Sequence, residues 1–446
     1  MKLLTGILAA VMLWPISIFA QTDTTQAEIT LLKSKRYQTM EDIGGNYCQA
    51  RYRDHAWDNV GQFALETLKP KYVRFALPLR KWEPENDNDR PNSIDLSKFE
   101  YNEVMLSLFD MLKTMKEEYG VVNFVASVWD GPVWMIANPE ERQQRKINPE
   151  MYREVLESVA AFMLVARDEY GVEIDYFSFN EATGGYQILF TPEEIIEFMK
   201  IGGPYFRKFG FKTNFLTADA HSTATCVEYA KPILATEELH PYLGPLSYHS
   251  WWSDRIGNDV FQEIADLADQ YSLPVWCTEL GYDAMLYKQE GDPYKTWENG
   301  WRLAKVTHRA IKHSKTTVTH YWTYQNNFPL LREAENPFPA YYAMKHFADY
   351  LPGGTTIVEA KKTDPDLWVF AGSKGADYTM INVLNTASYP KTITFRNLPE
   401  QTFHWIFTNE AGNMMQHRDS FEVEAGSFTV EVPPFTINTF TTKIAE

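Results

Sequence analysis

The amino-acid sequence predicts an α/β protein with a (β/α)8 barrel, the TIM barrel, and an associated all-β side sandwich. Strand-like and helix-like segments alternate through eight units between residues 39 and 352, and only short strand-like segments follow Pro352. No GxGxxG or phosphate-binding loop follows any strand-like segment, which argues against an open nucleotide-binding sheet. The 446 residues suit one barrel and one smaller domain, because a single core stops growing at about 250–300 residues.

The eight barrel strands are expected in short runs rich in β-branched and aromatic residues. These runs lie at 43–47, 72–76, 123–127, 174–179, 213–218, 246–249, 275–278 and 317–322. The clearest helix is expected at 150–170, between the third and fourth strands. Its apolar residues recur with the helical period and are Tyr152, Val155, Leu156, Val159, Phe162, Met163 and Ala166.

After Pro352 the pattern changes to strands separated by turn residues. Strand-like runs occur at 367–370, 378–383, 392–395, 403–407, 421–423 and 428–432, which favours an antiparallel sandwich. The run at 28–32 is also strand-like, and we expect it to join the same sandwich. The expected organisation is therefore residues 21–38 as N-terminal strand of the sandwich, 39–352 as the barrel and 353–446 as the sandwich domain.

Residues 1–20 are typical of a secretory signal peptide. Lys2 supplies a positive start, residues 3–19 are mostly apolar, and Ala20 before Gln21 suits a cleavage site. This pattern predicts a secreted or periplasmic protein. No later segment is apolar and long enough to span a bilayer, so we expect no membrane insertion after cleavage.

Charge and aromatic content narrow the class of partner. The formal net charge is −17, which would repel a phosphate backbone and argues against nucleic acid. The chain has 13 Trp, 25 Tyr and 27 Phe. Aromatic planes stack on the apolar faces of sugar rings, so this content fits a carbohydrate partner, although most of these side chains are expected in the core. We expect a monomer.

Cysteine and histidine spacing indicates no metal or cofactor. Cys48, Cys226 and Cys277 form no CxxC pattern, and the chain has no HExxH motif and no calcium-loop motif. Cys277 is expected to be a buried free thiol, while the sequence leaves open whether any cysteines pair. Asp219, His221 and His240 are interpreted as ordinary loop residues.

Two carboxylates stand at the ends of predicted barrel strands. Asn180-Glu181 closes the fourth strand and Glu279 closes the seventh. Catalytic residues of such barrels lie at the C-terminal ends of the strands. Glycoside hydrolysis needs two carboxyl groups beside one bond, one protonated and one ionised. The pair predicts this chemistry, whereas the Asn-Glu dipeptide alone, which recurs at 102–103 and 409–410, has little value.

These positions resemble glycoside hydrolases of clan A, which carry Asn-Glu after strand four and Glu after strand seven. Within the clan the chain is most similar to glycoside hydrolase family 30. The resemblance rests on YQTMEDIGG at 37–45, SVWDGPVWM at 127–135 and VPPFTINTF at 432–440. The middle segment departs from the family's usual Ser-Pro-Trp-Ser-Pro-Pro-x-Trp-Met at Asp130-Gly131, and the first has Asp42-Ile43 in place of Gly-Phe.

The resemblance implies a retaining mechanism and a set of roles. Glu181 would be the general acid/base and Glu279 the nucleophile. Asn180 would bind the sugar 2-hydroxyl, and Arg74, at the end of strand two, would keep Glu279 ionised. Tyr248 or His249 would hydrogen-bond Glu279. The remaining expected substrate-binding residues lie in loops or strand ends of the same face and are Trp129, Asp130, Trp134, Trp251 and Trp322.

Other functions remain open on the sequence alone. A catalytically inactive carbohydrate-binding barrel and a transglycosylase both fit the same pattern. The sugar, the linkage and the choice between endo and exo action are also open, because relatives of this type act on glucosides, xylans, galactans and β-1,6-glucans.

Overall fold

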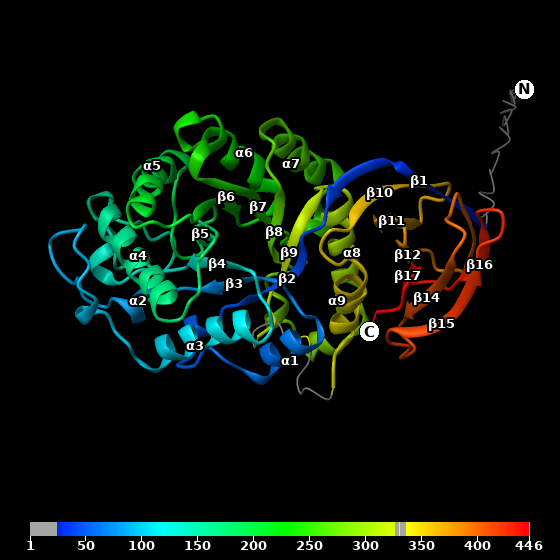
Figure 1. Cartoon of the computed structure of the whole chain (residues 1–446), viewed down its shortest axis with the longest axis horizontal. Coiled ribbons are helices and arrows are strands. Elements are labelled where there is room, and N and C mark those ends of the chain that lie inside the picture. Colours follow the sequence, from blue (N-terminus) through cyan, green and yellow to red (C-terminus); the bar gives the residue numbers. More distant parts are fainter. Residues whose placement is uncertain (1–24, 326–329, 331–335, 446) are drawn as a thin grey trace, which may run out of the picture.

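The computed structural model describes residues 25–325, 330 and 336–445. They form a barrel surrounded by helices and, beside it, a second body built of strands (Figure 1). The signal peptide expected at residues 1–20 lies outside the described residues. In the described part, no helix combines the length and the apolar character that crossing a membrane requires.

The barrel is closed by eight parallel strands, as the alternation predicts. In order around the barrel they are β2 (Asp42–Tyr47), β3 (Tyr72–Ala76), β4 (Asn123–Val128), β5 (Tyr176–Phe179), β6 (Asn214–Ala220), β7 (Leu243–His249), β8 (Val275–Leu280) and β9 (Thr316–Tyr321). β9 pairs with β2 and closes the ring. Every expected strand is present, with ends displaced by a few residues.

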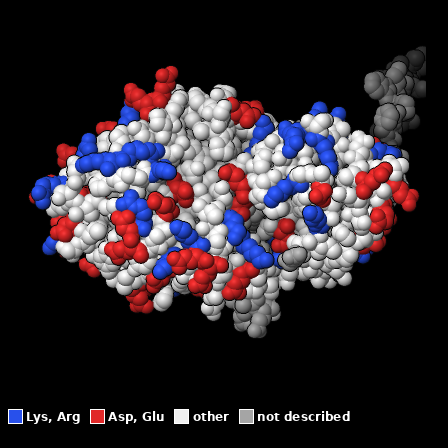
Figure 2. Space-filling model, viewed as in Figure 1, with Lys and Arg blue, Asp and Glu red and all other residues white. Residues whose placement is uncertain are grey.

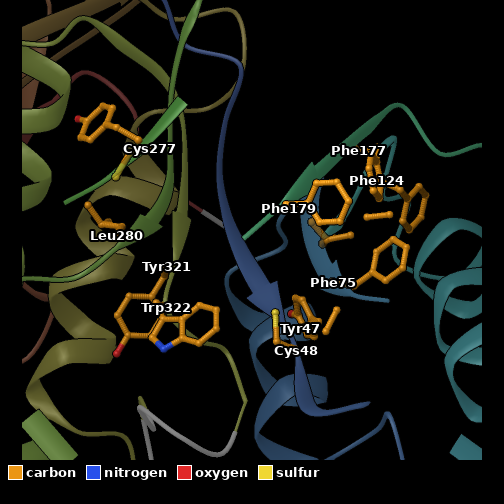
Figure 3. Packing of buried hydrophobic residues seen from close by; sticks show 14 of the residues in the cluster. Tyr47, Cys48, Phe75, Phe124, Phe177, Phe179, Cys277, Leu280, Tyr321 and Trp322 are labelled. Atoms are coloured by element: carbon orange, nitrogen blue, oxygen red, sulfur yellow. The ribbon is translucent and has the colours of Figure 1, made fainter. Parts of the chain in front are cut away.

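Helices cover the outside of the barrel (Figure 1). They are α1 (Asn59–Thr67), α2 (Leu79–Trp82), α3 (Glu103–Glu117), α4 (Tyr152–Asp168), α5 (Pro192–Lys208), α6 (Thr223–Leu234), α7 (Asn258–Tyr271), α8 (Trp297–Lys312) and α9 (Pro339–Tyr350). The helix expected at 150–170 is α4. Figure 3 shows Phe75, Phe124, Phe177 and Phe179 gathered on the helix side of their strands.

The second body is a nine-stranded, mostly antiparallel sheet. Its order is β15 (Gln416–Glu422), β14 (Thr402–Thr408), β17 (Thr436–Thr441), β12 (Tyr378–Asn385), β11 (Leu367–Lys374), β10 (Thr356–Lys362), β1 (Gln26–Thr39), β13 (Lys391–Arg396) and β16 (Phe428–Val432). The N-terminal strand therefore does join it, antiparallel to β10 and parallel to β13. β10 was not expected from the sequence.

Side chains inside the barrel form two layers of different chemistry. The layer nearer the N-terminal ends of the strands is apolar, and Val125, Leu216, Trp276 and Val318 pack together there. Two residues further along β3, β4, β5 and β8 the inward side chains are polar, since side chains of a strand alternate between its faces. This second layer, nearer the C-terminal ends of the strands, consists of Arg74, Ser127, Ser178 and Thr278. The fold thus places a buried polar floor at the C-terminal end of the barrel.

The structure also bears on the cysteines and on the distribution of charge. Cys48, Cys226 and Cys277 are buried free thiols, so no disulfide forms among the described residues. Figure 2 shows acidic and basic side chains interspersed over the viewed face of both bodies.

Candidate active site

Arg74 of β3 is the centre of the polar floor. The side chain is fully buried and its guanidinium donates hydrogen bonds at 2.6–3.0 Å to Asn46, Glu279, Ser127, Asn180 and Asp219. Its guanidinium carbon also lies 4.9 Å from the ring centre of Trp129. Burial disfavours the charged form, but the negative charges of Asp219 and Glu279 outweigh burial and raise the pKa of Arg74. Arg74 is therefore a permanent cation beneath the site.

Glu279 of β8 is held by three donors. Arg74 Nη1 lies 3.0 Å from Oε1, Trp251 Nε1 lies 3.1 Å from Oε2, and His249 Nδ1 lies 3.2 Å from Oε2. The Trp251 ring reaches this position because residue 281 is glycine. A Cβ atom on Gly281 would lie 2.2 Å from Cζ3 of the indole. Glu279 is 3 % exposed, so its carboxylate is fixed in a nearly closed environment.

Glu181 follows β5 and faces Glu279. Its backbone adopts φ 52°, a left-handed conformation that is uncommon outside glycine and is found at functional sites. His249 Nδ1 lies 3.2 Å from Oε1 of Glu181. Burial raises the pKa of Glu181, a hydrogen bond from His249 opposes this rise, and the negative charge of Glu279 adds to it. The environment therefore favours the protonated form of Glu181 more than an exposed position would.

The two glutamates and His249 form one compact group. One oxygen of each carboxylate and one ring nitrogen of His249 lie within 4.8 Å of one another. That spacing also suits a metal ion, but Glu279 already accepts three hydrogen bonds and its neighbour Arg74 is a cation. Hydrogen bonds therefore organise this group, and the expectation that no metal is required stays an expectation.

Asp219 is part of the site, and its interpretation as a loop residue was wrong. It lies in β6, is 1 % exposed and contacts Arg74, Ser178 and Thr278 through its carboxylate. Its Oδ1 atom also lies 3.4 Å from Nε2 of His249. Burial alone would raise the pKa of Asp219, yet the positive charges of Arg74 and His249 hold it far below its usual range.

His249 of β7 joins Asp219 to both glutamates. Its Nε2 atom faces Asp219, and its Nδ1 atom faces Glu181 and Glu279. Burial opposes a charge on the ring, but the surrounding carboxylates outweigh burial and raise the pKa of His249 well above its ordinary value. Of the two candidates for a partner of Glu279, His249 is the one that contacts it.

Tyr248 does not lie in the site, so the structure contradicts its assignment to substrate binding. Successive side chains of a strand point to opposite faces, and Tyr248 points away from the barrel interior. Its hydroxyl lies 2.7 Å from Ser314 Oγ and 3.2 Å from Thr316 Oγ1, and its ring packs on Phe261 of α7. Tyr248 is a core residue between the barrel and its helices.

A cleft of about 600 Å³ opens above the two glutamates. It is lined by Arg51, Tyr52, Arg53, Trp129, Asn180, Glu181, Tyr186, Trp251, Trp252, Glu279, Ala284, Met285, Tyr287 and Trp322. A neighbouring hollow of about 490 Å³ shares Arg51, Tyr52, Trp129 and Tyr186 with it and extends to Arg80, Lys81 and Asp130. The shared residues make the two hollows parts of one elongated groove.

Five of the nine expected substrate-binding residues line this groove, namely Trp129, Asp130, Asn180, Trp251 and Trp322. Trp129 and Trp322 lie side by side with ring centres 6.0 Å apart. Asp130 lines the groove while it is ion-paired with Arg145 and Arg80. Trp134 is not among the lining residues of either hollow. Its partly buried indole packs against the core and donates to the Glu83 carbonyl at 3.4 Å, so its assignment to substrate binding stays a prediction.

Several groove residues were not found from the sequence. Tyr52, Tyr186 and Tyr287 are 46 %, 46 % and 53 % exposed. Arg51 lies 4.8 Å from the Tyr52 ring centre and 5.5 Å from that of Tyr186. These side chains come from separate loops without periodicity, so no sequence signal joins them. One feature of the sequence could have identified Asp219 as a site residue: it is an acidic residue near the C-terminal end of a predicted barrel strand.

Several solved structures share this fold. A family 30 subfamily 8 xylanase from Clostridium acetobutylicum matches with TM-score 0.73 and 17 % identity over 94 % of this chain and 99 % of that chain. The chain has the fold of glycoside hydrolase family 30. A conserved exported protein from Bacteroides fragilis matches with TM-score 0.72 and 12 % identity over 93 % of this chain and 99 % of that chain.

A third similar structure is an enzyme with a different described activity. An endo-β-1,6-glucanase matches with TM-score 0.66 and 16 % identity over 94 % of each chain. No protein-family model and no curated protein sequence matches the chain. At such identities the likeness establishes the fold, and the expectation of a barrel with a side sandwich is confirmed.

Proposed function

We propose that this protein is a retaining glycoside hydrolase that cleaves β-glycosidic bonds by double displacement. The observation that carries the proposal is the separation of Glu181 and Glu279. Their nearest carboxylate oxygens lie within 4.8 Å. Retaining enzymes hold the two carboxyl groups about 5–5.5 Å apart, whereas inverting enzymes need about 6.5–9.5 Å to admit a water molecule.

The surroundings of the two groups support different roles. Glu279 accepts hydrogen bonds from Arg74 and Trp251, which fix its carboxylate in one orientation and suit it to attack an anomeric carbon. Glu181 has a raised pKa, which favours the protonated form that donates to the leaving oxygen. In the first step Glu279 bonds to the sugar as Glu181 gives its proton to the departing group. In the second step Glu181 takes a proton from water, which releases the sugar from Glu279.

His249 and Asn180 position this chemistry. His249 donates at Nδ1 between the two carboxylates, so the other oxygen of Glu181 is left to carry the transferred proton. The Oδ1 atom of Asn180 accepts from Arg74 at 2.6 Å, which leaves its amide N–H groups to face the groove. We assign these N–H groups to the sugar 2-hydroxyl, where a hydrogen bond strengthens in the transition state.

The groove favours a poly- or oligosaccharide substrate. Its two hollows extend well beyond one sugar ring, and exposed tyrosines line its sides. The similar structures include a xylanase and an endo-β-1,6-glucanase, both named for polysaccharides. Residues 1–20 support export, and a similar structure is also described as exported. We expect a secreted or periplasmic monomer.

An inactive carbohydrate-binding barrel is the main rival. Both carboxylates are present and close together, which argues against it. A transglycosylase shares the first half of the mechanism and differs only in the acceptor. The first step of the proposal is common to both, whereas hydrolysis in the second step is not.

Proton NMR of the first product tests the proposal. Purified protein is incubated with xylan, β-1,6-glucan and aryl β-glycosides, and the anomeric proton is followed before mutarotation. We expect a β-configured first product and, with methanol added, a methyl β-glycoside. An α-configured first product would contradict retention. Absence of any product, or equal product from a Glu181→Gln/Glu279→Gln double variant, would favour the inactive barrel.

A further inference from the structure

One end of the groove is positively charged, although the whole chain has a net charge of −17. This basic end is the hollow of about 490 Å³, and the charged side chains that line it are Arg51, Arg80, Lys81 and Asp130. Arg51 also lines the cleft above the two glutamates, so the basic end adjoins them. A concave surface with mostly one sign of charge attracts groups of the opposite sign.

Arg51 is a partly buried cation without an anionic partner. Its Nη2 atom donates to Oε1 of Gln187 at 2.7 Å. Its guanidinium carbon lies 4.8–5.5 Å from the ring centres of Tyr52, Trp129 and Tyr186. Among the described residues, no carboxylate forms an ion pair with Arg51. Removing a cation from water costs free energy unless an anion approaches it, so this surrounding favours an anionic ligand.

Asp130 gathers two more arginines at the basic end. It stands where family 30 usually has serine. Its Oδ2 atom accepts from Nη1 of Arg80 at 3.0 Å, and its Oδ1 atom pairs with Arg145. Arg145 is 5 % exposed, and its Nε atom is buried without a hydrogen-bond partner in the described part of the chain. One carboxylate thus serves two guanidinium groups, which leaves an excess of positive charge.

Backbone contacts hold the loops that carry these side chains. Nζ of Lys81 donates to the carbonyls of Ala50 and Arg53 at 3.3 and 2.6 Å, on either side of Arg51. The backbone N–H of Arg145 donates to the Gln187 carbonyl at 2.6 Å. The basic end is therefore largely ordered before a ligand arrives, which lowers the entropic cost of binding.

We propose that the basic end binds the carboxylate of a uronic acid unit, so that the polysaccharide in the groove is an acidic one. A guanidinium offers paired N–H donors that match the two oxygens of a carboxylate. Tyr52 and Tyr186, each 46 % exposed, supply aromatic surface for the sugar ring beside Arg51. A neutral sugar would leave Arg51 without an anion. Cleavage of this polysaccharide rests on the function proposed above, whereas its binding does not.

Affinity electrophoresis of the purified full chain tests the proposal. The protein migrates through gels that contain polygalacturonate, alginate or chondroitin, and through gels that contain the carboxyl-reduced form of each polymer. We expect at least one acidic polymer to bind about tenfold more tightly than its reduced form, the size of effect of a hydrogen bond to a charged group. Carboxyl-reduced chondroitin sulfate is the probe for sulfate. Binding to that probe alone would overturn the proposal, because the site would then recognise a sulfate ester.

Variants locate the subsite. Arg51→Met should weaken binding of the acidic polymer about tenfold and leave binding of the reduced polymer unchanged. Arg153→Met removes an exposed arginine of α4, outside both hollows, and should bind like the wild type. If Arg51→Met fails to fold, Arg80→Met takes its place, since that side chain is 55 % exposed. Equal losses in the Arg51 and Arg153 variants would show unspecific attraction and overturn the subsite.

Binding and cleavage are measured separately, so the two proposals can fail separately. A protein that retains the acidic preference but cleaves no polymer would contradict the hydrolase and keep the subsite. A protein that binds or cleaves the carboxyl-reduced polymers as well as the acidic ones would contradict the subsite and keep the hydrolase. Absence of binding to all three acidic polymers would also overturn the subsite.

Discussion

The guanidinium of Arg74 donates to Oε1 of Glu279 at 3.0 Å from a position with no exposed surface. The two side chains come from strands on different sides of the barrel, and the barrel interior alone brings them together. Arg74 also contacts Asp219, so a single cation offsets two buried carboxylates. Its removal should therefore affect stability as well as activity.

Arg74→Met should destabilise the fold by about 3–5 kcal/mol, because two buried carboxylates lose their cation. Arg80→Met is the matched control, since Arg80 pairs with Asp130 while its own side chain is 55 % exposed. That change should cost about 0–1 kcal/mol. Urea unfolding followed by tryptophan fluorescence measures both. Equal losses of stability in the two variants would show that Arg74 is not the electrostatic centre of the site.

The pH dependence should follow from the raised pKa of Glu181. The protonated form is the active one, so activity is present below this pKa and is lost as pH rises through it. A double-displacement mechanism needs one protonated and one ionised carboxyl group, so the profile of kcat/KM should be bell-shaped. Glu181→Gln should remove the alkaline decline on an aryl glycoside with a good leaving group. A flat wild-type profile from about pH 4 to 8 on a poor leaving group would contradict the assignment.

Much of the barrel could be predicted from the sequence because its signal is local. Each strand is a short apolar run and each helix has its own period, so eight units can be counted without tertiary information. β10 was missed because only the first part of Thr356–Lys362 is apolar and its last two residues are exposed lysines. The N-terminal strand was expected in the sandwich, but its place between β10 and β13 depends on pairing partners more than 300 positions away.

The candidate site was predictable only where strand ends mark it. Glu181 and Glu279 each close a buried strand, which made them visible. The choice between Tyr248 and His249 was not decidable, because β7 is buried on both faces and its residues show no alternation of polarity.

Trp251→Phe should lower kcat by about 10–100-fold, because it removes one hydrogen bond to a charged group and keeps the ring. Trp252→Phe alters a neighbouring groove tryptophan and should change kcat much less. Gly281→Ala should resemble Trp251→Phe, since the added Cβ would displace the indole from Glu279. Steady-state kinetics on one aryl glycoside measures all three. Wild-type kcat in Gly281→Ala would mean that the indole position is unimportant.

The N-terminal strand should stabilise the protein without touching the chemistry. Ile29 of β1 is fully buried in the sandwich core, so Ile29→Ala should cost about 2–5 kcal/mol. Lys35→Ala alters an exposed position of the same strand and should leave the Tm unchanged. Deleting residues 25–38 should make the protein insoluble, because β1 lies inside the sheet and its loss exposes two edges. A soluble deletion variant with unchanged Tm would show that β1 is dispensable.

Azide rescue should separate the two glutamates by role. Glu279→Ala should abolish turnover of every substrate, because no covalent intermediate forms without the nucleophile. Glu181→Ala should still complete the first step on an activated aryl glycoside, whose leaving group needs little protonation, and should accumulate the intermediate as a burst.

Added azide should then restore turnover in Glu181→Ala and give a β-glycosyl azide, because azide attacks the intermediate without a general base. In Glu279→Ala, azide that enters from the vacated side should instead give an α-glycosyl azide. Product configuration by NMR distinguishes the two. If Glu181→Ala stays fully active on a natural polysaccharide while Glu279→Ala gives the α-azide, Glu279 remains the nucleophile and another acid must act. Asp130 would be the first candidate, because it lines the same groove.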